Sequence, residues 1–303
     1  MSNNLEKDDK RATITDLISR SEDEGSQFFR SSSSKAIVNE AVVIENTVNS
    51  TSAEASRVFI QDRLRSMNML VSGSELGPQF SDEYRRIKRP LLSNAFGKSA
   101  ALAERGNLIL VTSSIPGEGK THTAINLALS IANERDHTVL LVDCDVTRHG
   151  ASEMLGISDK PGLVEVLEND AFTVGDAILR TDVPELCLIS AGKQHDFVTE
   201  LLASQKMSDF VAEIGERYDD RIIIFDGPPL LSTPQTQVLT GLVGQVAFVV
   251  EAGKTPQSIV EEALEMIPED QATGIVLNKS EGVSGHGGYY YGYYGYYGSE
   301  YKE

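Results

Sequence analysis

The residues most suited to chemistry follow an apolar segment at 108–112. There the sequence at 114–121 reads SIPGEGKT, which matches the phosphate-binding P-loop apart from a serine in its first position. Small residues are needed in such a loop because backbone N–H groups must turn towards phosphate oxygens at the start of a helix. The sequence therefore predicts a binding site for the phosphates of a nucleotide.

Two side chains of this loop have specific chemistry. Lys120 can reach the β- and γ-phosphates, and the Thr121 hydroxyl can bind Mg²⁺. The residues that we expect around the nucleotide are Ser114, Pro116, Gly117, Glu118, Gly119, Lys120, Thr121 and His122. For His122, packing in the first turn of the helix is an alternative. For the whole loop, the alternative is a turn that only joins a strand to a helix.

Acidic residues follow two further apolar segments. The segment 221–225 leads into Asp226, in the Walker B arrangement, where a carboxylate holds Mg²⁺ directly or through water. The segment 140–142 leads into Asp143 and Asp145. A lone acid in such a place is commonly a helix cap or a turn residue. Because ligands of doubly wound sheets bind at the carboxyl ends of the strands, we expect all three motifs to meet and to bind a nucleotide.

Alternating apolar and amphipathic segments indicate the elements that position these motifs. Strands are expected at 108–112, 138–142, 186–190, 221–225, 246–251 and 273–277, and helices at 121–133, 200–218 and 256–267. Apolar strands that alternate with helices predict an α/β fold, a P-loop NTPase with a mostly parallel sheet flanked by helices.

The residues before the first of these strands are less regular. Polar composition predicts disorder in the N-terminal region, and spaced apolar residues at 57–70 predict a short helix. Ser81 or Asp82 could cap a second helix, EYRRIKRPLLSNAF. The expected regions are a disordered N-terminal region at 1–55, a helical lead-in at 56–105, the P-loop domain at 106–280 and a Gly/Tyr-rich tail at 281–303.

The tail has an unusual density of one side chain. Its tyrosines are Tyr289, Tyr290, Tyr291, Tyr293, Tyr294, Tyr296, Tyr297 and Tyr301, with glycine between them. Glycine favours a flexible, extended segment that could enter a narrow site, so the tyrosines could accept phosphate. The alternative is a low-complexity tail that promotes self-association.

Composition restricts the class of protein further. The net charge of −18 argues against a protein that coats nucleic acid, so no nucleic-acid partner is expected. Cys144 and Cys187 form no CxxC pair, which fits a reducing compartment. The N-terminus shows no secretory signal and the chain no apolar run of membrane-spanning length, so we expect a cytoplasmic protein.

Taken with the tail, these motifs make the chain resemble the bacterial tyrosine kinases, or BY-kinases, which are MinD/ParA-like P-loop proteins. The resemblance covers about 82–279 plus the tail, and its carriers are SIPGEGKT, LLVDCD, IIIFDGPP and GGYYYGYYGYYG. EYRRIKRPLLSNAF and GPPLLST are most similar to the exosortase-associated tyrosine autokinases. Glu83, Arg86 and Arg89 match the ExxRxxR pattern that the family associates with ring assembly.

Some positions depart from the family. Thr147 stands where an arginine usually follows the second acidic motif, and Gln235 stands where many members have an aspartate. The early lysine of MinD and ParA loops is absent, which favours a kinase over a MinD/ParA-like ATP-switched positioning ATPase. A scaffold that binds nucleotide and only displays its tail is a further alternative.

The resemblance implies an ATP-dependent tyrosine autokinase whose acceptors are the tail tyrosines. Lys120 would hold phosphates and assist transfer, Thr121, Asp145 and Asp226 would bind Mg²⁺, and Asp143 would accept or orient the tyrosine proton. Asn278 would contact adenine.

The implied partners are other copies of the chain in a ring, with the tail acting in trans, a membrane chain-length-determinant or polysaccharide co-polymerase protein, and a cognate tyrosine phosphatase. The implied process is exopolysaccharide or capsule polymerisation and export, at the inner face of the plasma membrane and through that membrane partner.

Overall fold

A computed structural model describes residues 57–71, 76–97, 104–134, 136–194, 198–217, 220–233 and 235–280. Both the disordered region predicted at 1–55 and the tyrosine tail at 281–303 lie outside the described residues. In the described part, no helix combines the length and the apolar character needed to cross a bilayer.

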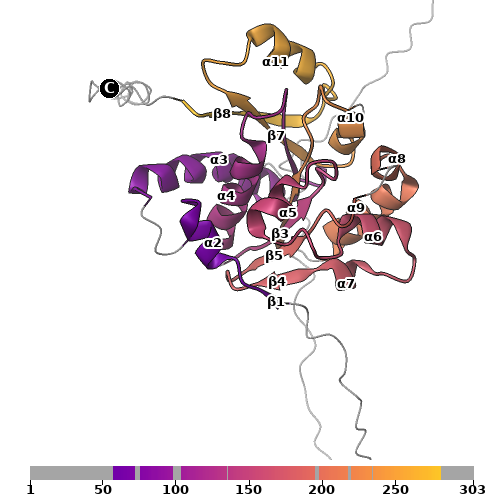
Figure 1. Cartoon of the computed structure of the whole chain (residues 1–303). Coiled ribbons are helices and arrows are strands. Elements are labelled where there is room, and N and C mark those ends of the chain that lie inside the picture. The colour runs from indigo at the N-terminus through magenta and orange to yellow at the C-terminus, as the bar shows by residue number, and fades with distance from the viewer. Residues whose placement is uncertain are drawn as a thin grey trace, which may run out of the picture. The chain divides into compact units, whose positions relative to one another are not determined.

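One sheet organises the described residues (Figure 1), in the order β1-β4-β5-β3-β6-β2-β7-β8. Its strands are β1 (Arg57–Val58), β2 (Leu108–Ser113), β3 (Thr138–Asp143), β4 (Leu179–Thr181), β5 (Leu186–Ile189), β6 (Arg221–Asp226), β7 (Gln245–Glu251) and β8 (Ala272–Asn278). The β4–β5 pair is antiparallel and the other neighbours are parallel. The predicted fold class, a mostly parallel sheet with flanking helices, is confirmed.

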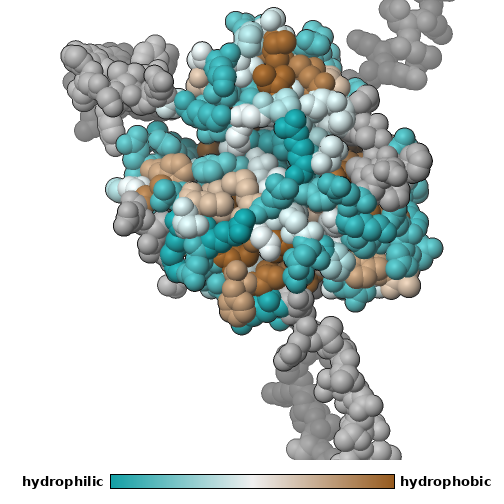
Figure 2. Space-filling view, viewed as in Figure 1, coloured by the Kyte–Doolittle hydropathy of each residue, from teal (hydrophilic) through white to brown (hydrophobic). Residues whose placement is uncertain are grey.

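The helices lie on both faces of this sheet (Figure 1). They are α2 (Gln61–Ser66), α3 (Pro78–Phe96), α4 (Lys120–Ala132), α5 (Gly150–Leu155), α6 (Leu163–Glu168), α7 (Val174–Ala177), α8 (Val198–Leu202), α9 (Gln205–Glu216), α10 (Gln235–Thr240) and α11 (Gln257–Leu264). Along β2, Leu108 and Leu110 join one core cluster with α6 and α9, whereas Ile109 and Val111 join another with α3 and α4. Successive strand residues point to opposite faces, so β2 is apolar from Leu108 to Val111 and buried on both faces. Figure 2 shows mostly hydrophilic residues on the outside.

The prediction of one helix over 57–70 was wrong. Residues 57 and 58 pair with β4 as an edge strand, and the helix covers only Gln61–Ser66. Phe59, expected on the apolar face, is 80% exposed. The hydrogen bond from Ile60 N to the Asp182 carboxylate (2.8 Å) joins this segment to the loop after β4, a contact between positions 122 apart.

Two other helix boundaries differ from the predictions. Helix α3 begins at Pro78 after Gly77, so neither Ser81 nor Asp82 caps it. The predicted helix 200–218 is two helices, because the Ser204 side chain accepts a hydrogen bond from Met207 N and starts α9 afresh.

Helix α3 packs directly against α4, the helix that leaves the P-loop. Tyr84 and Leu91 are buried in the core cluster that also contains Ile125 of α4. Lys88 is buried, with its Nζ 2.8 Å from a Glu134 carboxylate oxygen. The lead-in helix is therefore fixed to the P-loop domain by apolar packing and by one ion pair.

Candidate active site

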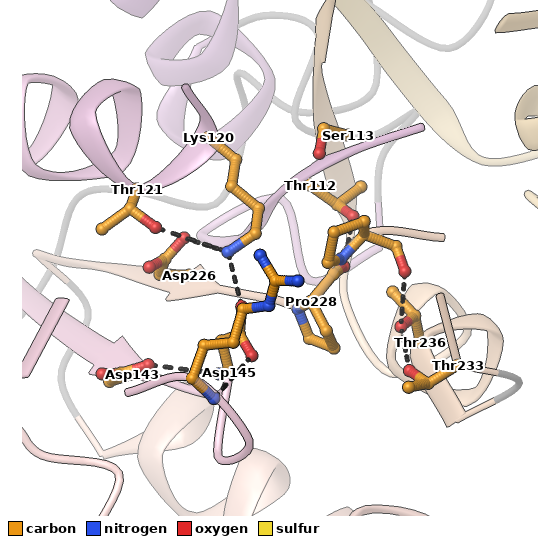
Figure 3. A network of polar contacts seen from close by, with 12 residues as sticks. Thr112, Ser113, Lys120, Thr121, Asp143, Asp145, Asp226, Pro228, Thr233 and Thr236 are labelled. Carbon is orange, nitrogen blue, oxygen red and sulfur yellow. Dashed lines mark hydrogen bonds and ion pairs between the residues drawn. The ribbon is translucent and has the colours of Figure 1, made fainter. Parts of the chain in front are cut away.

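The three predicted motifs meet at the carboxyl ends of neighbouring strands. β6 lies between β3 and β2, and Asp143 at the end of β3 pairs in register with Asp226 at the end of β6. The P-loop continues from β2, the other neighbour of β6. Figure 3 shows Lys120 pointing into the space beside Asp145 and Asp226. The sheet order thus brings together residues that are more than a hundred positions apart.

Lys120 lies among carboxylates. Its Nζ is 2.8 Å from Asp145 Oδ2, 3.7 Å from Asp226 Oδ1 and 3.3 Å from Thr121 Oγ1. Burial alone would lower the pKa of Lys120, but Asp226, Asp145 and Asp143 together raise it above its usual range. The ammonium group therefore stays charged, which suits a group that binds phosphates.

The environment of Asp226 is one that favours a bound cation. It is fully buried, and neither of its carboxylate oxygens has a hydrogen-bond partner. Burial raises its pKa to about 7, although Lys120 partly offsets this effect. A buried carboxylate without hydrogen bonds is costly unless a cation accompanies it. Lys120 is one such cation in this structure, and a divalent ion would be a stronger one.

The side chains beside Asp226 fit a magnesium ion. Mg²⁺ in nucleotide sites takes one or two carboxylates and completes its octahedron with a hydroxyl, water and phosphate oxygens. Asp145, Asp226 and Thr121 all lie around Lys120 Nζ. Within the described residues no group of three or more His, Cys, Asp or Glu side chains is arranged to hold an ion by itself. An ion here would therefore need further ligands from water or from a nucleotide.

Asp143 is held differently from the other two acids. Its carboxylate accepts hydrogen bonds from Ser152 N (2.8 Å), Ser152 Oγ (2.7 Å) and Asp145 N (3.1 Å). Burial raises its pKa, whereas the bonds from Ser152 oppose that effect. Sequence reasoning missed Ser152, because a serine at the start of a short helix carries no motif. The result is a carboxylate of fixed orientation at the base of the site.

The P-loop backbone requires glycine at one point of close approach. Gly119 has φ 98°, in the left-handed region that favours glycine, and a Cβ there would lie 2.0 Å from Asn278 Nδ2. Gly117 also has a positive φ, 93°. Ser114 is buried, and its Oγ has no hydrogen-bond partner. The loop is therefore tightly turned, and Asn278 lies against it.

Residues from the ends of β7 and β8 hold the loop from outside. Asn278 Nδ2 donates to the Glu118 carbonyl (2.8 Å), and Lys279 Nζ donates to the Gly117 carbonyl (2.6 Å). The Glu118 side chain, expected near the nucleotide, accepts from Thr255 Oγ1 (2.6 Å) and Ile115 N (2.8 Å). We call Glu118, Thr255, Asn278 and Lys279 the loop clamp. No sequence motif marked Thr255 or Lys279.

The remaining predicted residues lie outside this cluster. The ring of His122 lies near Asn126 Nδ2, which is 3.2 Å from Nδ1, and near the Phe80 ring at 6.4 Å between centroids, so the side chain contacts α3. The Glu83, Arg86 and Arg89 side chains are exposed on α3, on the face opposite the buried Tyr84, Lys88 and Leu91. The three exposed residues form a surface of their own, apart from the P-loop.

Comparison with known proteins places the chain in a family. A model described as an AAA domain matches residues 106–250. The tyrosine-protein kinase CpsD of Streptococcus agalactiae is 32% identical over 203 residues, which are 65% of this chain and 86% of CpsD. The succinoglycan biosynthesis transport protein ExoP of Rhizobium meliloti is 30% identical over 57% of this chain, but the match spans only 22% of ExoP.

A solved structure agrees with these sequence matches. The kinase domain of VpsO aligns over 66% of this chain and 96% of its own length, with a TM-score of 0.56 and 27% identity. The fold, the meeting of the three motifs and the similarity to CpsD over most of its length support one conclusion. The chain belongs to the family of bacterial tyrosine-protein kinases.

Proposed function

We propose that the chain is an ATP- and magnesium-dependent protein-tyrosine autokinase that phosphorylates its own C-terminal tyrosines. One observation carries the proposal: Lys120, Asp145 and Asp226 converge beside a P-loop, and the chain continues into a tyrosine-rich tail after β8. Phosphoryl transfer needs positioning and charge neutralisation more than covalent help from the protein. Buried charges of fixed orientation meet that need.

The residues divide into groups with separate tasks. Lys120 and the loop amides would hold the phosphates, and Thr121, Asp145 and Asp226 would hold Mg²⁺, which neutralises charge on the transferred phosphoryl group. Since Lys120 Nζ contacts Asp145 directly, it is already close to the proposed metal ligands. The loop clamp would keep the amides in place.

Asp143 would accept or orient the proton of the incoming tyrosine hydroxyl. Its raised pKa suits an acceptor that must hold a proton during transfer. The Ser152 hydroxyl donates a hydrogen bond to Asp143 and accepts one from Ala191 N. These two bonds would fix the orientation of the Asp143 carboxylate.

The wider role follows from the family and from the tail. We propose that copies assemble through Glu83, Arg86 and Arg89, that each tail enters a neighbouring copy, and that a membrane co-polymerase protein and a tyrosine phosphatase act with the kinase. The similarity to ExoP, a succinoglycan biosynthesis transport protein, supports an exopolysaccharide process. The three exposed side chains on one face of α3 support the assembly surface.

Intact-mass measurement tests the activity directly. The purified full chain should show a ladder of phosphate-mass steps that disappears on phosphatase treatment and maps to the C-terminal peptide. Lys120→Met should lose the ladder, with a fall in rate of about 10²- to 10³-fold or more, because a group that stabilises transferred charge is gone. The exposed Lys206→Met is the matched control.

Expression must take place in cells without another tyrosine kinase. A folded Lys120→Met chain with an unchanged ladder would overturn the kinase proposal. ATP hydrolysis without any label on the tail would favour the positioning ATPase instead.

A further inference from the structure

A cavity lies at the amino ends of β3, β5 and β6, at the opposite end of these strands from the P-loop. It has a volume of about 440 Å³ and is lined by the first residues of β3, β5 and β6 together with β4. The active-site acids lie at the other ends of β3 and β6, about a strand length away. The cavity is therefore separate from the nucleotide site.

Arginines dominate the charge of this cavity. Arg180 of β4, Arg217 after α9 and Arg221 at the start of β6 line it, and Glu185 is the carboxylate among its lining residues. Within the described residues Arg180 has no carboxylate partner at ion-pair distance. Arg217 Nη1 lies 3.4 Å from Glu213 Oε1, and both side chains of this pair are exposed. Exposed pairs of that kind contribute little stability. A cluster of positive charge is unusual in a chain with a net charge of −18.

The strand register adds a fourth guanidinium group beside the cavity. Arg57 of β1 pairs directly with Arg180 of β4, and both side chains are exposed. Like charges directly opposite each other on neighbouring strands destabilise a sheet. Charged side chains are common on edge strands such as β1, and a bound anion would in addition offset the repulsion between these two arginines.

The walls between the arginines are apolar. Ile178, Val183 and Pro184 line the cavity together with Cys187, the register partner of Arg180 on β5. Burial raises the pKa of the Cys187 thiol, Arg221 and Arg180 oppose that rise, and Glu185 adds to it. The cavity thus combines an apolar wall with three arginines and one carboxylate in its lining.

This combination matches one ligand chemistry. A phosphate carries a charge of about −1.5 to −2 and accepts paired hydrogen bonds from guanidinium groups, and an aryl ring needs an apolar wall. We propose that this cavity, the arginine pocket, binds the side chain of a phosphotyrosine. The tyrosine-rich tail of this chain is the source that we assign, and this assignment rests on the proposed function. Another phosphotyrosine protein is the alternative source.

Peptide binding tests the pocket without any need for kinase activity. The phosphatase-treated full chain is titrated, in the absence of ATP, into a fluorescent synthetic peptide of the tail sequence that carries phosphotyrosine, and anisotropy is measured. Binding should be at least about 10-fold tighter than for the unphosphorylated and phosphoserine forms of the peptide. A phosphotyrosine peptide of unrelated sequence distinguishes the two sources. If it binds more weakly than the tail peptide, the tail is the ligand, and if it binds equally well, the pocket accepts phosphotyrosine from any protein.

Variants locate the binding. Arg180→Ala and Arg217→Ala should each weaken it about 10-fold or more, and Arg180→Lys should weaken it less, because the charge remains but the paired donors do not. Lys206→Ala, at the other end of α9 from Arg217, is the control and should bind normally. The phosphotyrosine peptide should also protect Cys187 from alkylation.

Unchanged affinity in both arginine variants, or equal affinity for the phosphotyrosine and unphosphorylated peptides, would overturn the pocket. Equal affinity for the phosphoserine and phosphotyrosine peptides would contradict the proposal that the apolar wall binds the tyrosine ring. Because the peptide is synthetic, a chain that binds it but never labels its own tail would refute the proposed function and leave the pocket standing.

Discussion

Among single residues, charge balance inside the active site governs what each side chain can do. One lysine, Lys120, faces the carboxyl groups of Asp143, Asp145 and Asp226, so the cluster has an excess of negative charge when all three are ionised. That excess favours a divalent cation. Asp143 is satisfied by hydrogen bonds, whereas Asp226 has none, so protonation and metal binding should affect Asp226 most.

Stability of the nucleotide-free chain should report on Asp226. Its folded pKa of about 7 lies above the ordinary value of 3.8, so the folded chain holds a proton that the unfolded chain releases between those pH values. The free energy of unfolding should therefore decrease as pH rises through this window. Asp226→Asn should flatten that dependence and raise the free energy of unfolding at pH 8 by about 1–4 kcal/mol.

Urea denaturation between pH 4 and pH 8, roughly the span between the two pKa values, measures both effects. The exposed Asp159→Asn is the control and should change neither. A loss of stability at pH 8 in Asp226→Asn would show that Lys120 compensates the buried charge fully.

The two acids after β3 should have separable effects. Asp145→Asn should weaken binding of the magnesium nucleotide, because Asp145 lies 2.8 Å from Lys120 among the proposed metal ligands. Asp143→Asn should spare that binding and slow transfer by about 10²- to 10⁴-fold, the usual effect of losing a general base. Titration with a fluorescent nucleotide and single-turnover labelling give the two quantities. Equal losses of nucleotide affinity would refute the division.

Among the elements, the loop clamp links the last strand to the P-loop. Thr255 and Glu118 are 137 positions apart, and Lys279 and Gly117 are 162 apart, yet each pair is hydrogen bonded. β8 lies at the edge of the sheet, next to β7, so its end reaches the loop from outside. Nucleotide affinity should therefore depend on β8 even where β8 does not touch the ligand.

Asn278→Ala tests this dependence. The sequence suggested a contact with adenine, whereas the amide donates to the Glu118 carbonyl in the structure. If the loop contact dominates, affinity for ATP and for GTP should fall alike, by about 10-fold for one lost hydrogen bond. Thr273→Ala, exposed on the same strand, is the control. A loss confined to ATP, measured by calorimetry, would assign Asn278 to base recognition.

Elements and motifs were predictable from sequence to different extents. The central strands were found because both of their faces are buried and their central residues are continuously apolar, as in 222–225. Strands β1 and β4 have two and three residues, too few for any periodicity, and were missed. Lys120, Asp145 and Asp226 were found because phosphate chemistry restricts their spacing. Glu118 and Asn278 of the loop clamp were expected at the nucleotide, but their contacts with Thr255 and with the loop were not predicted, since contacts over such separations leave no local pattern.

At the scale of the whole molecule, the proposed assembly and the proposed tail phosphorylation can be tested together. The exposed face of α3 carries Glu83, Arg86 and Arg89, while its buried face packs on α4. A head-to-tail interface on this face would close into a ring and bring each tail to the next copy. Several phosphates on subunits of net charge −18 would then add repulsion and loosen the ring.

A mixing experiment tests this cycle. A Lys120→Met chain with an intact tail is mixed with an active chain that lacks residues 285–303. Label should appear on the intact tail and should disappear when Arg86 and Arg89 are replaced by alanine in both chains. Arg85→Ala removes an exposed arginine of the same helix, paired only weakly with Asp82, and should leave the labelling unchanged.

Absence of label in the mixture, together with autophosphorylation of the full chain at a rate independent of its concentration, would show that each tail is modified by its own subunit.

The packing of α3 on α4 has a thermodynamic consequence. Tyr84 and Leu91 share a core with the helix whose first residue is Lys120, so the proposed assembly face and the lysine proposed to bind phosphate belong to helices packed against each other. Coupling free energies are reciprocal. If nucleotide changes the association constant of the subunits by some factor, association changes nucleotide affinity by that same factor. A nucleotide titration at rising protein concentration therefore measures the coupling without any measurement of subunit contacts.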